Sequence, residues 1–279
     1  MKSTVIIYHA HCPDGFSAAW AAWKKFKDRA EYYPVEPRTL PSVKFKKRDI
    51  YVLDNSLSHE DVAMLLKNKN TVTIIDHHIS SEKDVKSAPQ FVFDNDHSGA
   101  MLAWMFFHPK KPIPQLLKHV EDIDLWKFKL AHTKEIGTIT NQTEFTFKEW
   151  NKLAAIVENP IRKKALIHQG KLLLAYDSEL IKRLVENAYE VEFLGYRVLV
   201  SNTPLLHSET GNALTKKMPP LGIVWYEKHG VRRFSLRSDG SVDVSKLAAT
   251  FGGGGHKAAS GFTLSSDAPF PWKVITPHV

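Results

Sequence analysis

The sequence predicts an α/β protein with an N-terminal parallel-sheet domain, a helical linker and a smaller C-terminal α/β domain with a mixed sheet. Three observations predict this class. Short β-branched runs alternate with amphipathic helical segments over roughly the first hundred residues, as in βαβ units. A long amphipathic stretch runs from about Pro160 to Ala188. Beyond it, strand-like runs return, and two of them close at Gly or Asn turns.

The N-terminal elements follow in a regular order. STVIIYHA, EYYPVEP, DIYVLDNS and TVTIIDHH read as strands, because β-branched and aromatic residues dominate them. FSAAWAAWKKFKD, HEDVAMLLKNK and HSGAMLAWMFFH read as helices, the last capped by Asp96 or Ser98. Strands that alternate with helices in this way indicate a parallel sheet with helices on both faces.

The later part of the chain divides at the long helical stretch. Residues 110–190 are predicted to be mostly helical, and the C-terminal strands are YEVEFLGYRVLVSN, PPLGIVWYEK and VRRFSLRS, followed by a short helix, VDVSKLAATF. We therefore expect one domain over residues 1–160, a helical linker over 161–190 and a second domain over 191–279.

Composition sets the broad class. The 279 residues are 43% hydrophobic and include no run of about 18 apolar residues, so no membrane span is expected. Cys12 is the only cysteine, which excludes an internal disulfide, and a cytoplasmic protein is the simplest interpretation. The net charge of +8 suits a polyanionic partner, although lysine clusters such as 24–29, 44–49 and 161–165 are also typical of ordinary solvated surface.

Metal-ligand side chains end three of the predicted strands. His9, His11 and Asp14 follow the first, Asp54 ends another, and Asp76, His77 and His78 end a third. The carboxyl ends of parallel strands share one edge of a sheet, where ligands usually bind. Crowded carboxylates there need cations, and imidazole with carboxylate suits a divalent metal.

Each group also has a simpler explanation. Asp54 could be a turn residue or helix cap, and His9 or His11 alone could be a satisfied polar group. Three adjacent ionisable residues directly after Val-Thr-Ile-Ile are harder to explain without a metal. The set as a whole therefore predicts a metal centre.

At Asp76-His77-His78 the chain resembles the DHH family of phosphoesterases. A second motif, GGGGHKAASGF (252–262), is similar to the glycine-rich motif of the C-terminal domain commonly joined to DHH domains. EDIDLW (121–126) resembles the later aspartate motif of the family. The resemblance spans essentially the whole chain.

The resemblance implies a role for each matching residue. Asp14 would bind metal with His9, Asp54 would bridge two ions, and His77 would be a further ligand. Asp76 would orient His77, and His78 would face the substrate phosphate. The last ligand would come from EDIDLW, where Asp122 fits the family pattern better than its rival, Asp124.

The first motif departs from the family pattern. Cys12 stands where the commoner form has its first aspartate, and the upstream histidine is one residue closer than usual if it is His9. A thiolate could ligate a softer metal, His11 could substitute, or the site could bind its ion weakly. A role for Cys12 as a covalent nucleophile is disfavoured, because a metal-bound water already supplies one.

The glycine run suggests an anion site. Four consecutive glycines followed by His-Lys-Ala-Ala indicate a loop whose N–H groups approach a phosphate, closed by a helix N-terminus. A structural turn is the alternative. The expected substrate-binding residues are Gly253, Gly254, Gly255, His256 and Lys257, joined by Arg237 and Ser238.

Together these features predict a metal-dependent phosphodiesterase. The resemblance implies a 3′–5′ oligoribonuclease that cuts short single-stranded RNA or linear dinucleotides such as pGpG, with two Mn²⁺ ions as cofactor and Mg²⁺, Co²⁺ or Zn²⁺ as alternatives. A cyclic-dinucleotide phosphodiesterase, a nucleotide 3′-phosphatase and a catalytically impaired nucleic-acid-binding protein are the rival functions. The sequence leaves the oligomeric state open and is compatible with a homodimer.

Overall fold

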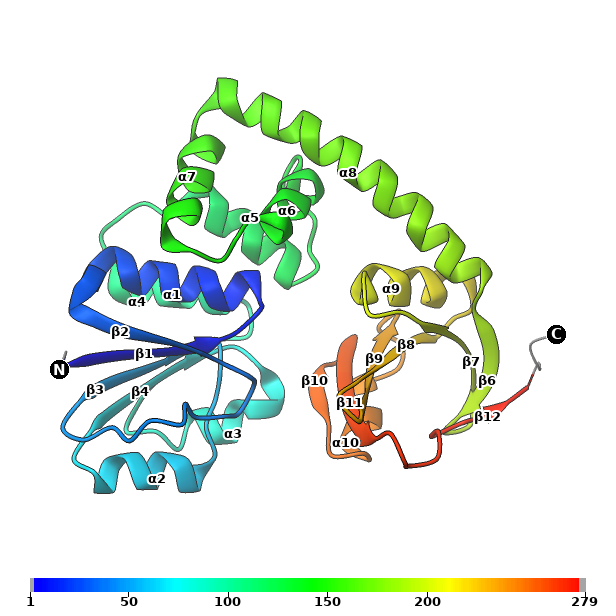
Figure 1. The fold of residues 1–279 in the computed structure, drawn as a ribbon, viewed down its shortest axis with the longest axis horizontal. Coiled ribbons are helices and arrows are strands. Elements are labelled where there is room, and N and C mark those ends of the chain that lie inside the picture. Colours follow the sequence, from blue (N-terminus) through cyan, green and yellow to red (C-terminus); the bar gives the residue numbers. More distant parts are fainter. Residues whose placement is uncertain (1–2, 276–279) are drawn as a thin grey trace. The chain divides into compact units, whose positions relative to one another are not determined.

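The computed structural model describes residues 3–275, and the chain divides into two compact units, residues 1–174 and 175–279. The division falls within helix α8 (Pro160–Glu186), which has 27 residues. The fold class is the expected one: a parallel sheet, a helical middle and a mixed C-terminal sheet (Figure 1).

The N-terminal unit contains a five-stranded sheet in the order β2-β1-β3-β4-β5, with every neighbouring pair parallel. The strands are β1 (Thr4–His9), β2 (Ala30–Val35), β3 (Asp49–Leu53), β4 (Thr71–Asp76) and β5 (Gln90–Phe93). Helices α1 (Pro13–Phe26) and α4 (Gly99–Phe107) cover one face, and α2 (His59–Lys67) and α3 (Glu82–Val85) lie on the other (Figure 1). Short 3₁₀ turns occupy Lys27–Arg29 and Ile79–Ser81.

Two hydrophobic cores hold this sheet. Trp20 of α1 stacks on Trp104 of α4, with ring centroids 5.7 Å apart, in the core on the first face. Val52 and Leu65 belong to the core on the α2 face. Because both faces are covered, the central strands are apolar throughout, which explains why they were readable in the sequence.

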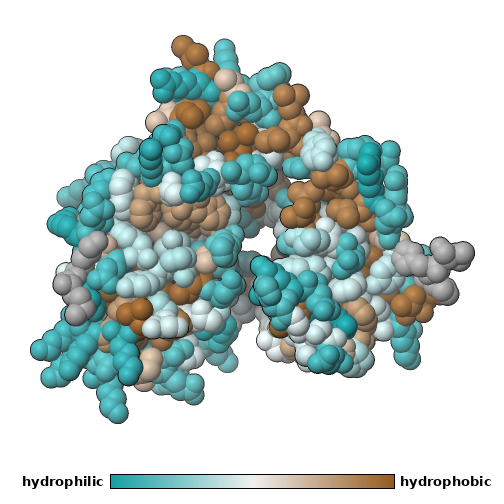
Figure 2. Space-filling view, in the orientation of Figure 1, coloured by the Kyte–Doolittle hydropathy of each residue, from teal (hydrophilic) through white to brown (hydrophobic). Residues whose placement is uncertain are grey.

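Helices α5 (Gln115–Asp124), α6 (Thr133–Gln142) and α7 (Phe147–Glu158) follow and pack beside α1 (Figure 1). Apolar patches are visible among the middle helices in Figure 2, where hydrophilic side chains cover most of the remaining surface. Within residues 3–275, no helix combines the length and apolar content that a membrane crossing requires.

The C-terminal unit is a seven-stranded mixed sheet in the order β10-β11-β9-β8-β7-β6-β12, in which β7 and β8 pair in parallel and the other pairs are antiparallel. Its strands are β6 (Tyr189–Phe193), β7 (Tyr196–Asn202), β8 (Leu221–Lys228), β9 (Val231–Ser238), β10 (Gly254–His256), β11 (Ala259–Ser265) and β12 (Lys273–Val274). Helix α9 (His207–Lys217) packs on β7, β8 and β9, and α10 (Val244–Ala249) packs on β9, β10 and β11.

The glycine run differs from the expectation. No helix begins after it; Gly254–His256 instead forms β10, which pairs antiparallel with β11. Gly252 has φ +74° and Gly255 has φ +141°, and an added Cβ on Gly253 would lie 2.2 Å from the carbonyl oxygen of Gly261. These glycines therefore allow a tightly paired hairpin, and the expected helix N-terminus is wrong.

Candidate metal centre

The three predicted strand ends lie side by side, because β1, β3 and β4 are neighbours in the sheet. His9 is the last residue of β1, Asp54 follows β3, and Asp76 ends β4 directly before His77. Asp54, Asp76 and His77 are all buried. The carboxyl edge of the parallel sheet therefore carries a buried cluster of acids and imidazoles.

His77 is the centre of this cluster. Its Nε2 atom lies 3.3 Å from Asp54 Oδ1, 3.5 Å from Asp124 Oδ2 and 3.8 Å from Asp14 Oδ2. Burial alone lowers the pKa of His77, but the hydrogen bond and charge of Asp54, with Asp124 and Asp14, raise it to about 10. Three carboxylates thus converge on one imidazole nitrogen.

Asp54 connects two sides of the cluster. Its Oδ1 faces His77, and its Oδ2 lies 3.3 Å from Nδ1 of His9. Burial raises the pKa of Asp54, but His77 and His9 together hold it well below the usual value. Asp54 has φ +51°, a strained value for a residue with a side chain, as is common at functional sites.

Asp14 is held by the N-terminus of α4. The N–H groups of Gly99 and Ala100 donate to its carboxylate at 2.7 and 3.0 Å. Burial raises the pKa of Asp14 well above its usual range, and repulsion from Asp54 and Asp124 adds to the effect. Sequence reasoning missed the contribution of Gly99, although the cap at Ser98 located the helix start.

Asp76 contacts both histidines that follow it. Its Oδ1 atom lies 2.7 Å from Nδ1 of His78 and accepts the backbone N–H of His77 at 2.8 Å. It therefore orients the ring of His78 and the backbone of His77. Burial lowers the pKa of His78, but the hydrogen bond and charge of Asp76 raise it overall.

Of the candidates in the first motif, His9 and Cys12 lie near Asp54. One potential ligand atom from each of these three residues lies within 4.8 Å of the others. Burial raises the pKa of the Cys12 thiol well above its usual value, and the negative charges of Asp54, Asp124 and Asp14 raise it further. His11, with φ +55°, is exposed and belongs to none of the ligand groups within residues 3–275.

Asp124, and not Asp122, lies in the cluster, which corrects the preference drawn from the family pattern. One ligand atom each from Asp14, His77 and Asp124 fall within 4.8 Å of one another. The carboxylate of Asp122 instead accepts the backbone N–H groups of Lys129 and Leu130 at 2.8 and 3.0 Å. Residues two apart on a helix point in different directions, so α5 can offer only one of them to the site.

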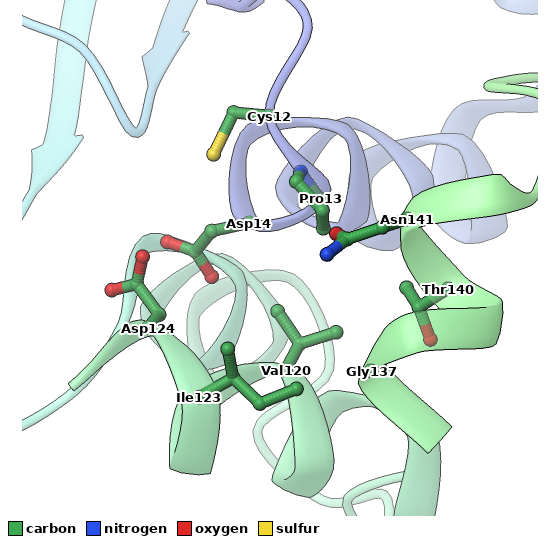
Figure 3. Close-up of a pocket in the computed structure, with 9 residues that line it drawn as sticks. All are labelled: Cys12, Pro13, Asp14, Val120, Ile123, Asp124, Gly137, Thr140 and Asn141. Atoms are coloured by element: carbon green, nitrogen blue, oxygen red, sulfur yellow. The ribbon is translucent and has the colours of Figure 1, made fainter. Parts of the chain in front are cut away.

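A small cavity of about 100 Å³ opens beside these side chains. In Figure 3 the carboxylates of Asp14 and Asp124 point toward one another, and the sulfur of Cys12 lies on the same side. Val120, Ile123 and Gly137 line the apolar wall.

The donor set fits divalent cations. The oxygens Asp76 Oδ2 and Asp124 Oδ2 are buried and have no hydrogen-bond partner among the described residues. Burying such charge without compensation is costly, and carboxylates with imidazoles are ligands that Mn²⁺, Mg²⁺ and Zn²⁺ accept. There are two candidate ligand groups around Asp54. Asp54 belongs to the first, with His9 and Cys12, and its Oδ1 faces His77 of the second, which also contains Asp14 and Asp124.

The expected substrate residues form a second arrangement, within the C-terminal unit. Arg237 of β9 pairs with Ala259 of β11, which pairs with His256 of β10, so Arg237 and His256 share one face of the sheet. The guanidinium of Arg237 donates to Ser208 Oγ at 2.7 Å, and burial lowers its pKa. Ser208, at the start of α9, gave no signal in the sequence.

The remaining predicted residues there have structural partners. The hydroxyl of Ser238 donates to the carbonyl of Val242 within its own turn. Gly254 and Gly255 belong to β10, and Lys257 lies in the turn between β10 and β11. The structure thus brings Arg237 and His256 onto one face and assigns Ser238 and Gly253 to the packing of the sheet and its turns.

Solved structures of known proteins share this fold. The chain has the fold of the DHH-family phosphoesterases. It superimposes on the DHH domain of a member of the s1p family of ribosomal proteins with a TM-score of 0.66 and 14% identity, covering 93% of this chain and 82% of that one. For the pGpG-specific phosphodiesterase PggH of Vibrio cholerae the TM-score is 0.51 at 13% identity, covering 95% and 94%. For RecJ of Thermus thermophilus in complex with Mn²⁺ it is 0.52 at 14% identity, covering 95% and 50%.

Two proteins are related to this chain in sequence. The chain is 30% identical over 289 residues to the uncharacterized protein R106 of Acanthamoeba polyphaga mimivirus, covering 94% of this chain and 67% of that protein, and it belongs to the same family. It is 25% identical over 172 residues to the oligoribonuclease NrnB of Bacillus subtilis, a match that covers 58% of this chain and 42% of NrnB. No family model matches the chain.

Proposed function

We propose that the protein is a metal-dependent phosphodiesterase that hydrolyses short single-stranded oligonucleotides or linear dinucleotides such as pGpG to mononucleotides, in the 3′–5′ direction. The observation that carries the proposal is the convergence of Asp14, Asp54 and Asp124 on Nε2 of His77. The likeness to NrnB, an oligoribonuclease, and to PggH, a pGpG-specific phosphodiesterase, favours this substrate class.

In the proposed site Asp14, Asp124, His77 and Asp54 would hold divalent metal, with His9 and Cys12 as further candidate ligands beside Asp54. Two such cations supply an activated water and offset the charge of the phosphate. Mn²⁺ is the proposed ion, since a RecJ structure of the same fold contains it. Mg²⁺, Co²⁺ and Zn²⁺ suit the same donors.

His78 would act on the substrate directly. Burial lowers the pKa of His78, but the hydrogen bond and charge of Asp76 raise it overall, and Asp76 fixes the ring through Nδ1. A positioned imidazolium stabilises phosphoryl oxygens as negative charge builds on them. Within the C-terminal unit, Arg237 and His256 are the proposed anion-binding residues.

The decisive experiment follows cleavage of 5′-labelled pGpG with Mn²⁺, beside a cyclic dinucleotide, adenosine 3′,5′-bisphosphate and pyrophosphate. We expect turnover of the linear dinucleotide and its loss in His77→Ala, while the exposed His168→Ala keeps wild-type activity. Preferred turnover of the cyclic dinucleotide or the bisphosphate would favour a rival activity. Binding of oligonucleotides without any hydrolysis would identify a nucleic-acid-binding protein instead.

A further inference from the structure

The 125–132 loop, LWKFKLAH, joins α5 to α6 and follows Asp124 of the metal cluster directly. It alternates aromatic and basic residues over Trp126, Lys127, Phe128 and Lys129. Trp126 is 43% exposed, an unusual position for so large an apolar ring. Its ring packs edge-on against Phe128, with centroids 4.8 Å apart.

The backbone of this loop is strained and tightly held. Trp126 and Phe128 have φ values of +54° and +48°, which side-chain-bearing residues rarely adopt. Asp122 satisfies four successive N–H groups, at positions 127 to 130. Its carbonyl accepts the first two at 2.9 and 3.1 Å, and its carboxylate accepts the next two at 2.8 and 3.0 Å.

A buried chain of hydrogen bonds supports Asp122 in turn. Lys163 Nζ lies 3.2 Å from Nε2 of His119, so the other ring nitrogen, Nδ1, carries the proton and donates to Thr133 Oγ1 at 2.8 Å. The hydroxyl of Thr133 is then oriented to donate to Asp122. The loop is therefore pre-organised, and the aromatic pair is held in place before any ligand binds.

The position and charge of the loop indicate what the rings contact. Trp126 follows Asp124 by two positions in the chain, so their Cα atoms are at most about 7.6 Å apart. Lys127 and Lys129 are exposed, and Lys134 Nζ lies 5.2 Å from the centroid of the Phe128 ring. Aromatic rings flanked by lysines match the base and backbone of single-stranded nucleic acid.

We propose that Trp126, supported by Phe128, stacks on a base of the substrate next to the phosphodiester that the Asp/His cluster cleaves. This inference rests on the proposed function. Stacking on an aromatic ring is tolerant of base identity, so Trp126 would select single-stranded nucleotides as a class and not one base. Asp122 is a positioning residue in this scheme, because it acts through the loop.

The test measures affinity for a fluorescent, non-hydrolysable dinucleotide in the presence of Mn²⁺, where binding is separated from turnover. We expect Trp126→Ala to weaken binding about 5- to 100-fold and Trp126→Phe to restore most of it. Phe91→Ala removes another exposed aromatic, 45% exposed on β5, and should leave affinity unchanged. A dinucleotide with abasic sites should bind wild type and Trp126→Ala equally.

Kinetics with Mn²⁺ provide the second readout, in which Trp126→Ala should raise KM and change kcat less than about threefold. The inference would be overturned if folded Trp126→Ala and wild type bound the normal dinucleotide with equal affinity. It would also be overturned if Trp126→Ala lost as much affinity for the abasic dinucleotide as for the normal one. A shift in oligomeric state without a change in affinity would make the ring a protein contact and would also overturn it. Base-dependent binding without hydrolysis by wild type would instead refute the proposed activity and leave the stacking role standing.

Discussion

Asp122 and Asp124 lie two residues apart on α5 and make different contacts. Asp124 faces His77, while Asp122 binds the backbone of the 125–132 loop. We expect Asp124→Asn to weaken Mn²⁺ binding more than about tenfold with little loss of stability, because it removes a ligand and also relieves repulsion. Asp122→Asn should cost about 1–3 kcal/mol of unfolding free energy, since it weakens charge-assisted bonds to the backbone N–H groups of Lys129 and Leu130. Calorimetric Mn²⁺ titration and denaturant unfolding separate the two effects.

The reverse outcome, with Mn²⁺ affinity lost in Asp122→Asn and kept in Asp124→Asn, would restore the ligand that the family pattern favours. Neither variant changes the size of the side chain, so packing cannot account for a difference between them.

We expect Cys12 to set the strength of the proposed second cation position. Its raised pKa keeps the thiol neutral at ordinary pH, and a neutral thiol is a poor ligand. We expect Cys12→Asp to lower the melting temperature in EDTA, because it adds a fourth carboxylate beside Asp14, Asp54 and Asp124. With Mn²⁺ the same variant should be stabilised more than wild type and bind the ion more tightly.

Cys12→Ser is the matched control for this prediction, since it keeps the size and the neutrality of the side chain and should behave like wild type in both conditions. An unchanged Mn²⁺ affinity in Cys12→Asp would make position 12 structural.

At the scale of elements, the start of α4 supports two of the acids. Its first N–H groups hold Asp14, and a Cβ added to Gly99 would lie 2.6 Å from the Cβ of Asp54. We expect Gly99→Ala to destabilise the fold by about 1–3 kcal/mol through overpacking and to weaken Mn²⁺ binding about tenfold or more by displacing Asp54. Thermal melts with and without Mn²⁺ measure both effects.

Phe106→Ala, on the exposed side of the same helix, is the control and should leave the Mn²⁺-dependent stabilisation intact. Wild-type metal affinity in Gly99→Ala would show that Asp54 does not depend on this close approach.

The sequence predicted those elements whose local pattern and tertiary environment agree. Strands β1, β3 and β4 are buried on both faces, so their sequences are continuous apolar runs that end in polar residues. This pattern predicted the strands and also the positions of Asp54 and His77 at their ends. Helix α9 was missed, because its sequence, HSETGNALTKK, is largely polar and packs on the sheet through few apolar side chains. The preference for Asp122 over Asp124 was wrong for another reason. The rotation of α5 about its own axis, relative to β4, decides which of the two carboxylates faces His77, and the local sequence does not determine that rotation.

For the molecule as a whole, charge is distributed unevenly. The net charge is +8, yet the Asp/His cluster gathers Asp14, Asp54 and Asp124 around His77. A basic protein attracts polyanions, and the acidic centre then needs cations before a phosphate can approach it. Metal binding and substrate binding should therefore be coupled.

The same arrangement couples metal binding to pH and to stability. The pKa of His77 is raised to about 10, and the pKa values of Asp14 and Asp124 are also raised, so protons compete with the cation for these groups. Since the cation binds their deprotonated forms, its affinity should rise with pH.

At a Mn²⁺ concentration of about 100 times the Kd, we expect about 2.7 kcal/mol of stabilisation and a rise in Tm of about 5–10 °C. At a fixed Mn²⁺ concentration the rise should be larger at pH 8.5 than at pH 6 in scanning calorimetry, and it should vanish in Asp54→Asn. A rise that is the same at both pH values, or larger at pH 6, would mean that these groups do not exchange protons for the metal.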